Sequence, residues 1–195
     1  MNSSSAKLPF IVERATELFW RNGYEGVSIE DIVKETGVNR YALYQSFGGK
    51  KGIFFACIDG YCEDAKMHML DLLAEPGKKA FDAIRESVVE KLCDGHMVDA
   101  GCLMTTTAVD IAPKDPEVAE LMQSHTAELK AMLQASLSRA QAEGDIAPTQ
   151  NLASISEIIF SLIVSAGVQA RMGLPHEKIR ADVDAAFCSL RYLPS

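Results

Sequence analysis

The chain has 195 residues, enough for one sizeable hydrophobic core or for a small module joined to a larger one. Hydrophobic residues make up 48% and charged residues 24%, a globular composition that argues against a disordered or fibrous protein. The net charge is −8, but residues 1–54 carry seven Lys and Arg against six Asp and Glu, whereas the rest carries 12 against 21.

The first predicted elements are three short helices separated by turns that contain glycine. Apolar residues at helical spacing predict a helix over about 9–22, which the glycines of "NGYEG" end. Ser28 and Asp31 have the spacing of a capping box, so a second helix is expected to begin there and to end at Gly37. Asn39 is suited to cap a third helix that follows at once.

Longer helices are predicted beyond "GGKKG", where a fourth helix covers 50–73. Further helical patterns cover 78–94, 99–112, 115–143, 149–172 and 176–191. Neither the alternation typical of strands nor an internal repeat stands out. We therefore predict an all-α protein with a domain at 1–50 and a second helical domain at 51–195.

The second and third helices, with a short turn between them, have the layout of a helix-turn-helix motif. From Thr36 to Phe54 there are three basic residues and no acidic one. Arginine and glutamine side chains can read base edges, while tyrosine hydroxyls and lysines can contact phosphate. The outward residues expected to do this are Arg40, Tyr41, Tyr44 and Gln45 on the third helix, with Lys50 and Lys51 at the start of the fourth. A helix pair that only packs in a bundle is the alternative reading.

The span "ATELFWRNGYEGVSIEDIVKETGVNRYALYQSFGGKKGIF", residues 15–54, resembles the N-terminal domain of the TetR family of transcriptional regulators. The family consists of all-α homodimers that bind palindromic operators and usually repress until a small molecule binds the C-terminal domain. The resemblance implies that Tyr44 and Lys50 contact phosphate, and that Arg40, Tyr41 and Gln45 face bases. Two departures are a bulkier Tyr41 and Lys51 in place of a frequent acid. The full predicted DNA-binding set is Ser28, Asn39, Arg40, Tyr41, Tyr44, Gln45, Lys50 and Lys51.

Two C-terminal helices are candidates for a dimer surface. In "LASISEIIFSLIVSAGVQA", apolar residues cover most of the circumference, so this helix must be buried on more than one side. Either the helices near 149–172 and 176–191 form an internal core, or they also pair with their copies in a two-fold homodimer. The family resemblance favours the dimer.

A small-molecule effector site is expected around "GCLMTTTAVDIAP", where three threonines and Asp110 could supply polar anchors and Cys102, Met104 and Val109 an apolar wall. The candidate ligand-binding residues are Cys102, Met104, Thr106, Asp110 and Phe160. The alternative is a helix with one solvated face. No cofactor is expected.

Cysteine and histidine residues raise two further alternatives. Cys93, His96 and Cys102 lie close in sequence, but without CxxC or HxxxH spacing they do not predict a metal site. Cys93 or Cys102 could be a nucleophile, yet no supporting His and Asp arrangement is visible, so we predict that the protein is not an enzyme. A thiol-based redox regulator and a helical interaction protein without DNA binding stay open as alternatives.

The sequence predicts a cytoplasmic protein without a membrane partner. The N-terminus has no apolar region typical of a secretory signal. The apolar run "ISEIIFSLIVSAGV" is expected to be too short to span a membrane, and it contains Glu157. An odd count of five cysteines favours reduced thiols over a disulfide framework.

Overall fold

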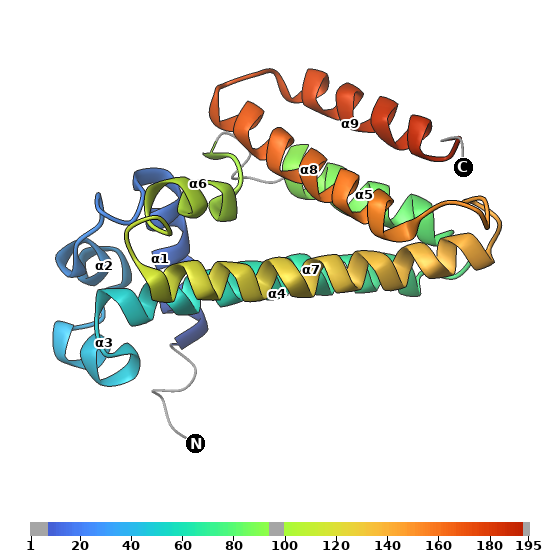
Figure 1. Cartoon of the computed structure of the whole chain (residues 1–195). Helices are drawn as coiled ribbons and strands as arrows, with labels where there is room; N and C mark the ends of the chain where they lie inside the picture. The colour runs from blue at the N-terminus through green and yellow to red at the C-terminus, as the bar shows by residue number, and fades with distance from the viewer. Residues whose placement is uncertain (1–7, 94–99, 193–195) are drawn as a thin grey trace. The chain divides into compact units, whose positions relative to one another are not determined.

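The computed structural model describes residues 8–93 and 100–192 as helices joined by turns, without a β-strand in those ranges (Figure 1). The helices are α1 Leu8–Asn22, α2 Ile29–Thr36, α3 Arg40–Phe47, α4 Lys50–Ala74, α5 Ala80–Cys93, α6 Leu103–Asp110, α7 Pro116–Ala142, α8 Leu152–Arg171 and α9 His176–Leu190. The all-α prediction is therefore confirmed. Each predicted helix is present, with bounds that differ by a few residues.

Local capping explains why α2 and α3 begin and end where they do. The Ser28 hydroxyl accepts from the Asp31 N–H at 3.1 Å, and the Asp31 carboxylate accepts from the Ser28 N–H at 2.8 Å. These bonds satisfy N–H groups that a helix start leaves without partners. The Ser28 hydroxyl also donates to the Asp31 carboxylate, and this bond, together with the one from the Ser28 N–H, lowers the pKa of Asp31. Gly37 ends α2 with φ at 67°, a left-handed conformation that glycine adopts without steric cost. The predicted capping box and stop signal are confirmed.

Contacts divide the chain into two compact units. The first contains the described residues up to Glu63 together with Thr106–Met122, and the second contains Asp64–Thr105 and Gln123–Ser195 as far as they are described. Residues of α4, α6 and α7 therefore belong to both units. The predicted domain division into 1–50 and 51–195 stays a prediction.

The first unit packs α1 against α2 and α2 against α3 around a small core. Its fully buried side chains include Phe19, Ile32, Leu43, Ile53, Phe54 and Ile58. The corner between α3 and α4 is tight, because a Cβ atom on Gly52 would lie 1.7 Å from the Phe47 carbonyl oxygen. Glycine at this position lets α4 start directly beside the end of α3.

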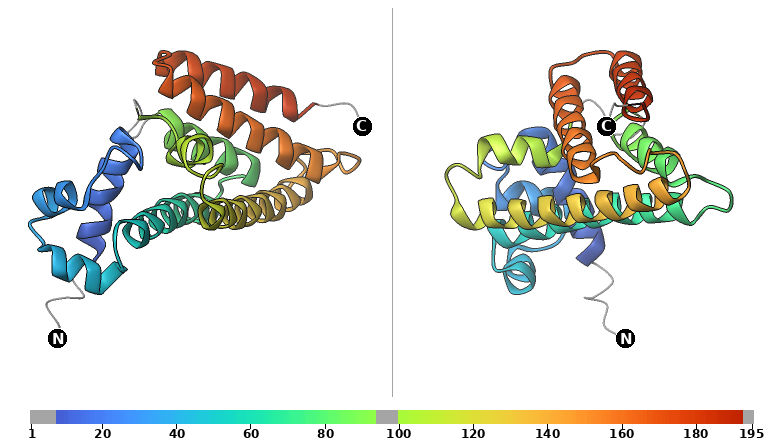
Figure 2. Two further views of the ribbon diagram at one scale, coloured as in Figure 1. Left: turned by 60° about the vertical axis from the view of Figure 1, so that its left-hand side comes forward. Right: turned by 45° about the vertical axis from the view of Figure 1, so that its right-hand side comes forward.

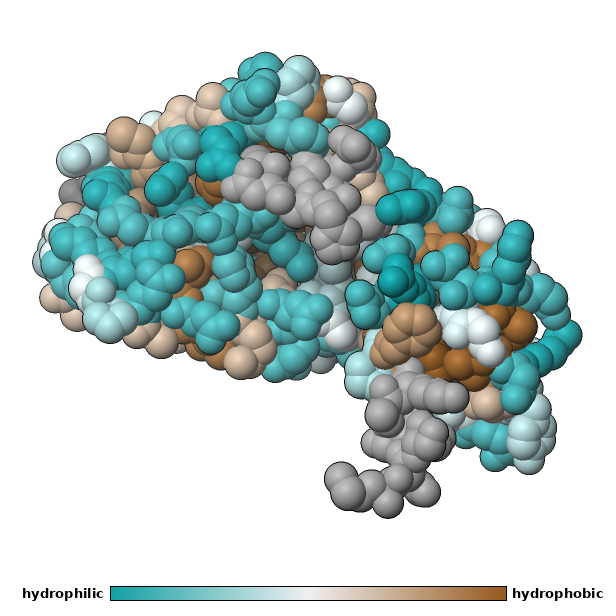
Figure 3. All heavy atoms as spheres, turned by 180° about the vertical axis from the view of Figure 1, so that it is seen from behind, coloured by the Kyte–Doolittle hydropathy of each residue, from teal (hydrophilic) through white to brown (hydrophobic). Residues whose placement is uncertain are grey.

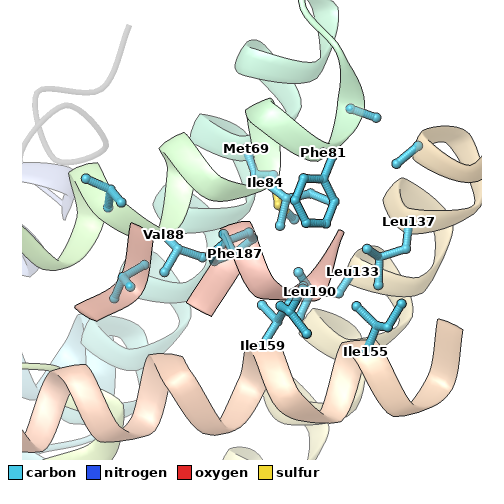
Figure 4. Close-up of a cluster of buried hydrophobic side chains, with 14 of the residues drawn as sticks. Met69, Phe81, Ile84, Val88, Leu133, Leu137, Ile155, Ile159, Phe187 and Leu190 are labelled. Carbon is cyan, nitrogen blue, oxygen red and sulfur yellow. The ribbon is translucent and has the colours of Figure 1, made fainter. Parts of the chain in front are cut away.

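The second unit has its own core, to which α4, α5, α7, α8 and α9 contribute. In Figure 1 and in both views of Figure 2, α8 and α9 run side by side, and both pack against α5. Figure 4 shows the side chains of this core pointing toward one another from these helices. Phe81 of α5 and Phe187 of α9 meet edge to face, with ring centroids 5.5 Å apart. A face of the protein seen in Figure 3 is mostly hydrophilic, with hydrophobic atoms in smaller areas.

Helix α8 corrects one expectation from the sequence. It is 20 residues long, and among the described helices it is the one that is long and apolar enough to cross a membrane by length and composition. The expectation that this stretch is too short was wrong, because the helix continues beyond the apolar run. Core helices pass the same test, and Ile155, Ile159 and Ala166 are buried in the core of the second unit.

Candidate nucleic-acid interface

Helices α2 and α3 form a helix-turn-helix whose inner side is apolar and whose outer side is polar. Ile32 of α2 and Leu43 of α3 are completely buried, and these two anchors fix the packing of the helix pair. Only residues 37–39 separate the helices. A short turn with a left-handed glycine lets the second helix leave at a steep angle to the first, as a groove-reading helix requires.

The outer side of α3 is built from side chains that donate hydrogen bonds or stack. Tyr41 is 75% exposed and Tyr44 is 44% exposed, large values for aromatic side chains. Gln45 and Ser46 are also exposed. The predicted base-facing residues are therefore brought together on one face, and α3 contains no acidic residue that would repel phosphate.

Arg40, the first residue of α3, is held by two neighbours. Its Nη1 atom donates to the Glu30 carboxylate of α2 at 2.6 Å, although both side chains are more than 60% exposed. Its guanidinium carbon lies 5.7 Å from the centroid of the Tyr44 ring. The interactions with Tyr44 and with Glu30 raise the pKa of Arg40, so the guanidinium stays charged.

Ser28 and Asn39 are the N-cap residues of α2 and α3, and this is the role that the structure gives their side chains. The Asn39 side-chain oxygen accepts from the Ala42 N–H at 2.9 Å. That bond uses the side-chain carbonyl oxygen of Asn39. The side-chain NH2 group can donate a hydrogen bond to a phosphate oxygen. The Ser28 hydroxyl also donates to the Asp31 carboxylate at 2.6 Å, so a phosphate would have to compete with this bond.

Lys50 begins α4 and is held by an aromatic ring rather than by an acid. Its ammonium lies 4.1 Å from the centroid of the Tyr24 ring, within the range of a cation–π contact. Tyr24 in turn packs against Phe54 of the core, with centroids 4.8 Å apart. A neutral ring orients the ammonium without neutralising it, so the full charge is still present for an anion.

Lys51 lies between two carboxylates of the same unit. Its ammonium is 2.8 Å from Asp115 and 3.0 Å from Glu117, at the start of α7. These contacts raise the pKa of Lys51, and the lysine lowers the pKa of Asp115. Local spacing does not predict this contact, because Asp115 lies 64 residues away in the sequence. Lys51 is therefore compensated within the protein, unlike Lys50.

Tyr24, Glu30, Asp115 and Glu117 are site residues that the sequence reasoning missed. Glu30 lies ten residues before Arg40, on the preceding helix of the motif. A sequence signal for this pair exists. It is an acidic residue near the start of the first helix of a helix-turn-helix, with an arginine as the first residue of the second helix. For the other three no local spacing is informative.

The candidate ligand-binding residues are divided between the two units. Cys102, Met104 and Phe160 belong to the second unit, whereas Thr106 and Asp110 belong with the first. Cys102 is buried against α8, and a Cβ atom on Gly167 would lie 2.6 Å from the Cys102 Cβ. The Phe160 ring lies 4.6 Å from the Lys130 ammonium. Asp110 is exposed.

The side chains of four cysteines are described, those of Cys57, Cys62, Cys102 and Cys188, and all four are free thiols. Burial raises the pKa of the Cys57 thiol to about 12, so it is protonated at neutral pH and is a poor nucleophile. Groups of three or more residues that could hold a metal ion are absent from the described residues. The His96 and Cys93 side chains lie outside them.

Comparisons with known proteins agree with this geometry. Residues 11–57 match the family described as bacterial regulatory proteins, tetR family, and residues 81–186 match the tetracyclin repressor-like C-terminal domain. The HTH-type transcriptional repressor ComR of Escherichia coli K12 is 29% identical over 171 residues, which are 86% of this chain and 81% of that protein. The HTH-type transcriptional regulator YezE of Bacillus subtilis 168 is 30% identical over 138 residues, which are 70% of this chain and 71% of that protein.

A solved structure shares the fold over nearly the whole chain. A cysteine mutant of the TetR family transcriptional regulator CifR, complexed with 26-base-pair double-strand operator DNA, superposes with a TM-score of 0.80. The match covers 92% of this chain and 94% of that one at 23% identity, a level that speaks for the fold alone.

Proposed function

Because the chain belongs to the TetR family of transcriptional regulators, we propose that it is a repressor that binds a palindromic operator as a homodimer and is released by a small-molecule effector. Regulators of this family are not enzymes. The observation that carries the proposal is the outer face of α3, where exposed Arg40, Tyr41, Tyr44 and Gln45 gather without an acidic residue. In this proposal α3 enters the major groove, while Lys50 and the start of α4 contact a phosphate.

A homodimer is supported by apolar side chains that α8 leaves exposed. Ile158, Val164 and Val168 are about 40% exposed, although they lie on a helix whose other side is in the core. The exposed side of α9 contains small residues such as Ala181 and Ala185, which allow another helix to approach closely. A two-fold interface through these helices would present two α3 helices to half-sites about one DNA turn, roughly 34 Å, apart.

An effector site in the C-terminal part completes the proposal. We place it near Cys102, Met104 and Phe160, all of which belong to the second unit. Met104 and Phe160 are half-buried, so each presents apolar surface beside polar neighbours. An effector acts as a release signal only if it binds the DNA-free form more tightly, so its addition must weaken operator binding.

The salt dependence of DNA binding tests the proposed interface, through two lysines that are next to each other in sequence. We expect Lys50→Ala to reduce the slope of log K against log[salt] by about 0.9 for each protomer bound, because one phosphate contact and its released counterion are lost. Lys51→Ala should change the slope by less than about half of this, since Asp115 and Glu117 already compensate that charge.

Fluorescence anisotropy with a labelled duplex, repeated across a range of salt concentrations, measures both slopes. Each variant serves as the control for the other, because each removes one positive charge. Binding of the wild-type protein that does not depend on salt would contradict the DNA-binding proposal. Equal slopes for the two variants would contradict the different roles of the lysines.

A further inference from the structure

The ion pair between Glu30 and Arg40 joins the two helices of the helix-turn-helix on their outer side. Glu30 is the second residue of α2 and Arg40 is the first residue of α3, so the contact bridges the turn. The bond is short, at 2.6 Å between Arg40 Nη1 and Glu30 Oε1. An acid in this place is unexpected on a surface that approaches phosphate, because it weakens the attraction for any DNA.

We propose that Glu30 is a positioning residue that sets sequence specificity by holding Arg40 in the orientation in which it reads a base. The inference rests on the proposed DNA-binding function and deepens it. An acidic side chain thereby acts at an interface whose other proposed contacts are basic, aromatic, amide or hydroxyl groups.

The geometry of arginine makes this role possible. A guanidinium has five N–H donors in a rigid fork, and Glu30 accepts from Nη1. The edge formed by Nε and Nη2 carries two parallel donors, which is the pattern that guanine accepts at O6 and N7 in the major groove. A hydrogen bond with the Tyr44 side chain also holds the guanidinium. The Tyr44 ring lies beside the guanidinium. Glu30 and Tyr44 together limit the directions in which Arg40 can point.

The same pair discriminates against other sequences. At a matching base, Arg40 can keep its bond to Glu30 and add two bonds to the base edge. On a random duplex the attractive partner is phosphate, and a swing of Arg40 toward it would break the bond to Glu30 and leave a carboxylate near the DNA backbone. Glu30 therefore weakens non-specific binding more than it weakens specific binding. This raises specificity, which is the difference between the two binding free energies.

Glu30→Gln tests the inference, with Glu35→Gln as the matched control. Glu35 is a second exposed acid of α2, so its replacement changes the net charge of the same helix by the same amount. Anisotropy gives dissociation constants for a selected operator and for a random duplex at one salt concentration. Specificity is the dissociation constant for the random duplex divided by that for the operator. We expect Glu30→Gln to lower this ratio by about tenfold, the size of one bidentate base contact. Glu35→Gln should tighten binding to both duplexes alike and leave the ratio within about twofold.

A double variant separates positioning from charge. Once Arg40→Ala has removed the side chain to be positioned, adding Glu30→Gln should no longer change the ratio. A ratio that is unchanged in Glu30→Gln alone, or that falls equally in the Arg40→Ala background, would overturn the role of Glu30. A wild-type protein without preference for any duplex would instead overturn the proposed function, so the two failures are distinguishable.

Discussion

Ile158→Asp is expected to convert the homodimer to monomers and to weaken operator binding by at least about 100-fold. Ile158 is 40% exposed on the outer side of α8, where we propose that two copies meet. A two-fold interface contains each residue twice, so the substitution buries two unpaired carboxylates, each at a cost of several kcal/mol. A monomer then contacts one half-site alone and loses the gain from binding two linked half-sites.

Sedimentation equilibrium reports the assembly state of this variant, and anisotropy reports its affinity for the operator. Ala131→Asp is the matched control, because it adds one carboxylate at an exposed position of α7. Circular dichroism should show the same helix content for both variants, since neither position is in the core. An Ile158→Asp protein that is still dimeric would place the interface on another surface.

Phe187→Ala is expected to lower the free energy of unfolding by about 3–5 kcal/mol. The Phe187 ring is 1% exposed and meets Phe81 edge to face, in a core to which five helices contribute (Figure 4). Its removal leaves a cavity that rigid helices fill only partly, so lost packing adds to lost hydrophobic burial.

Urea denaturation followed by circular dichroism measures this loss, at one protein concentration for all variants because dimerisation adds to the apparent stability. The neighbouring Cys188→Ala is the control, since Cys188 is exposed and its replacement should change stability by less than about 0.5 kcal/mol. A similar loss in both variants would contradict the assignment of Phe187 to the core.

The local structure of the helix-turn-helix could be predicted because short-range chemistry determines it. The Ser28 capping box, the left-handed Gly37 and the Asn39 cap each depend on residues no more than four positions apart. The buried faces of α2 and α3 follow helical periodicity, and Ile32 and Leu43 lie inside. Where local signals and burial agree, the sequence predicts the element.

The partners of the basic side chains could not be predicted in the same way. Lys50 and Lys51 are adjacent and equally charged, and both were predicted to contact DNA. Packing of α4 places one ammonium over the Tyr24 ring and the other between Asp115 and Glu117. The rotation of the helix and the path of a distant loop decide which of two neighbouring side chains meets an acid. Periodicity within one helix predicts neither the rotation nor the loop path.

The predicted effector residues show a related limit. Residues 101–113 contain both polar and apolar side chains, and this composition does not show which of the residues share a cavity. Cys102 packs against the backbone of α8 at Gly167, a close approach that depends on a glycine far along the chain. Phe160 lies beside Lys130 of α7. The effector assignment therefore stays a proposal.

Selection of bound sequences from a pool of random duplexes, at near-physiological salt and with Arg40→Ala in parallel, tests whether α3 reads DNA. We expect the wild-type protein to enrich a palindromic motif and Arg40→Ala, whose exposed position leaves the fold intact, to lose it. Failure of the folded wild-type protein to enrich any motif, or the same motif from both proteins, would contradict the claim that α3 reads DNA through Arg40.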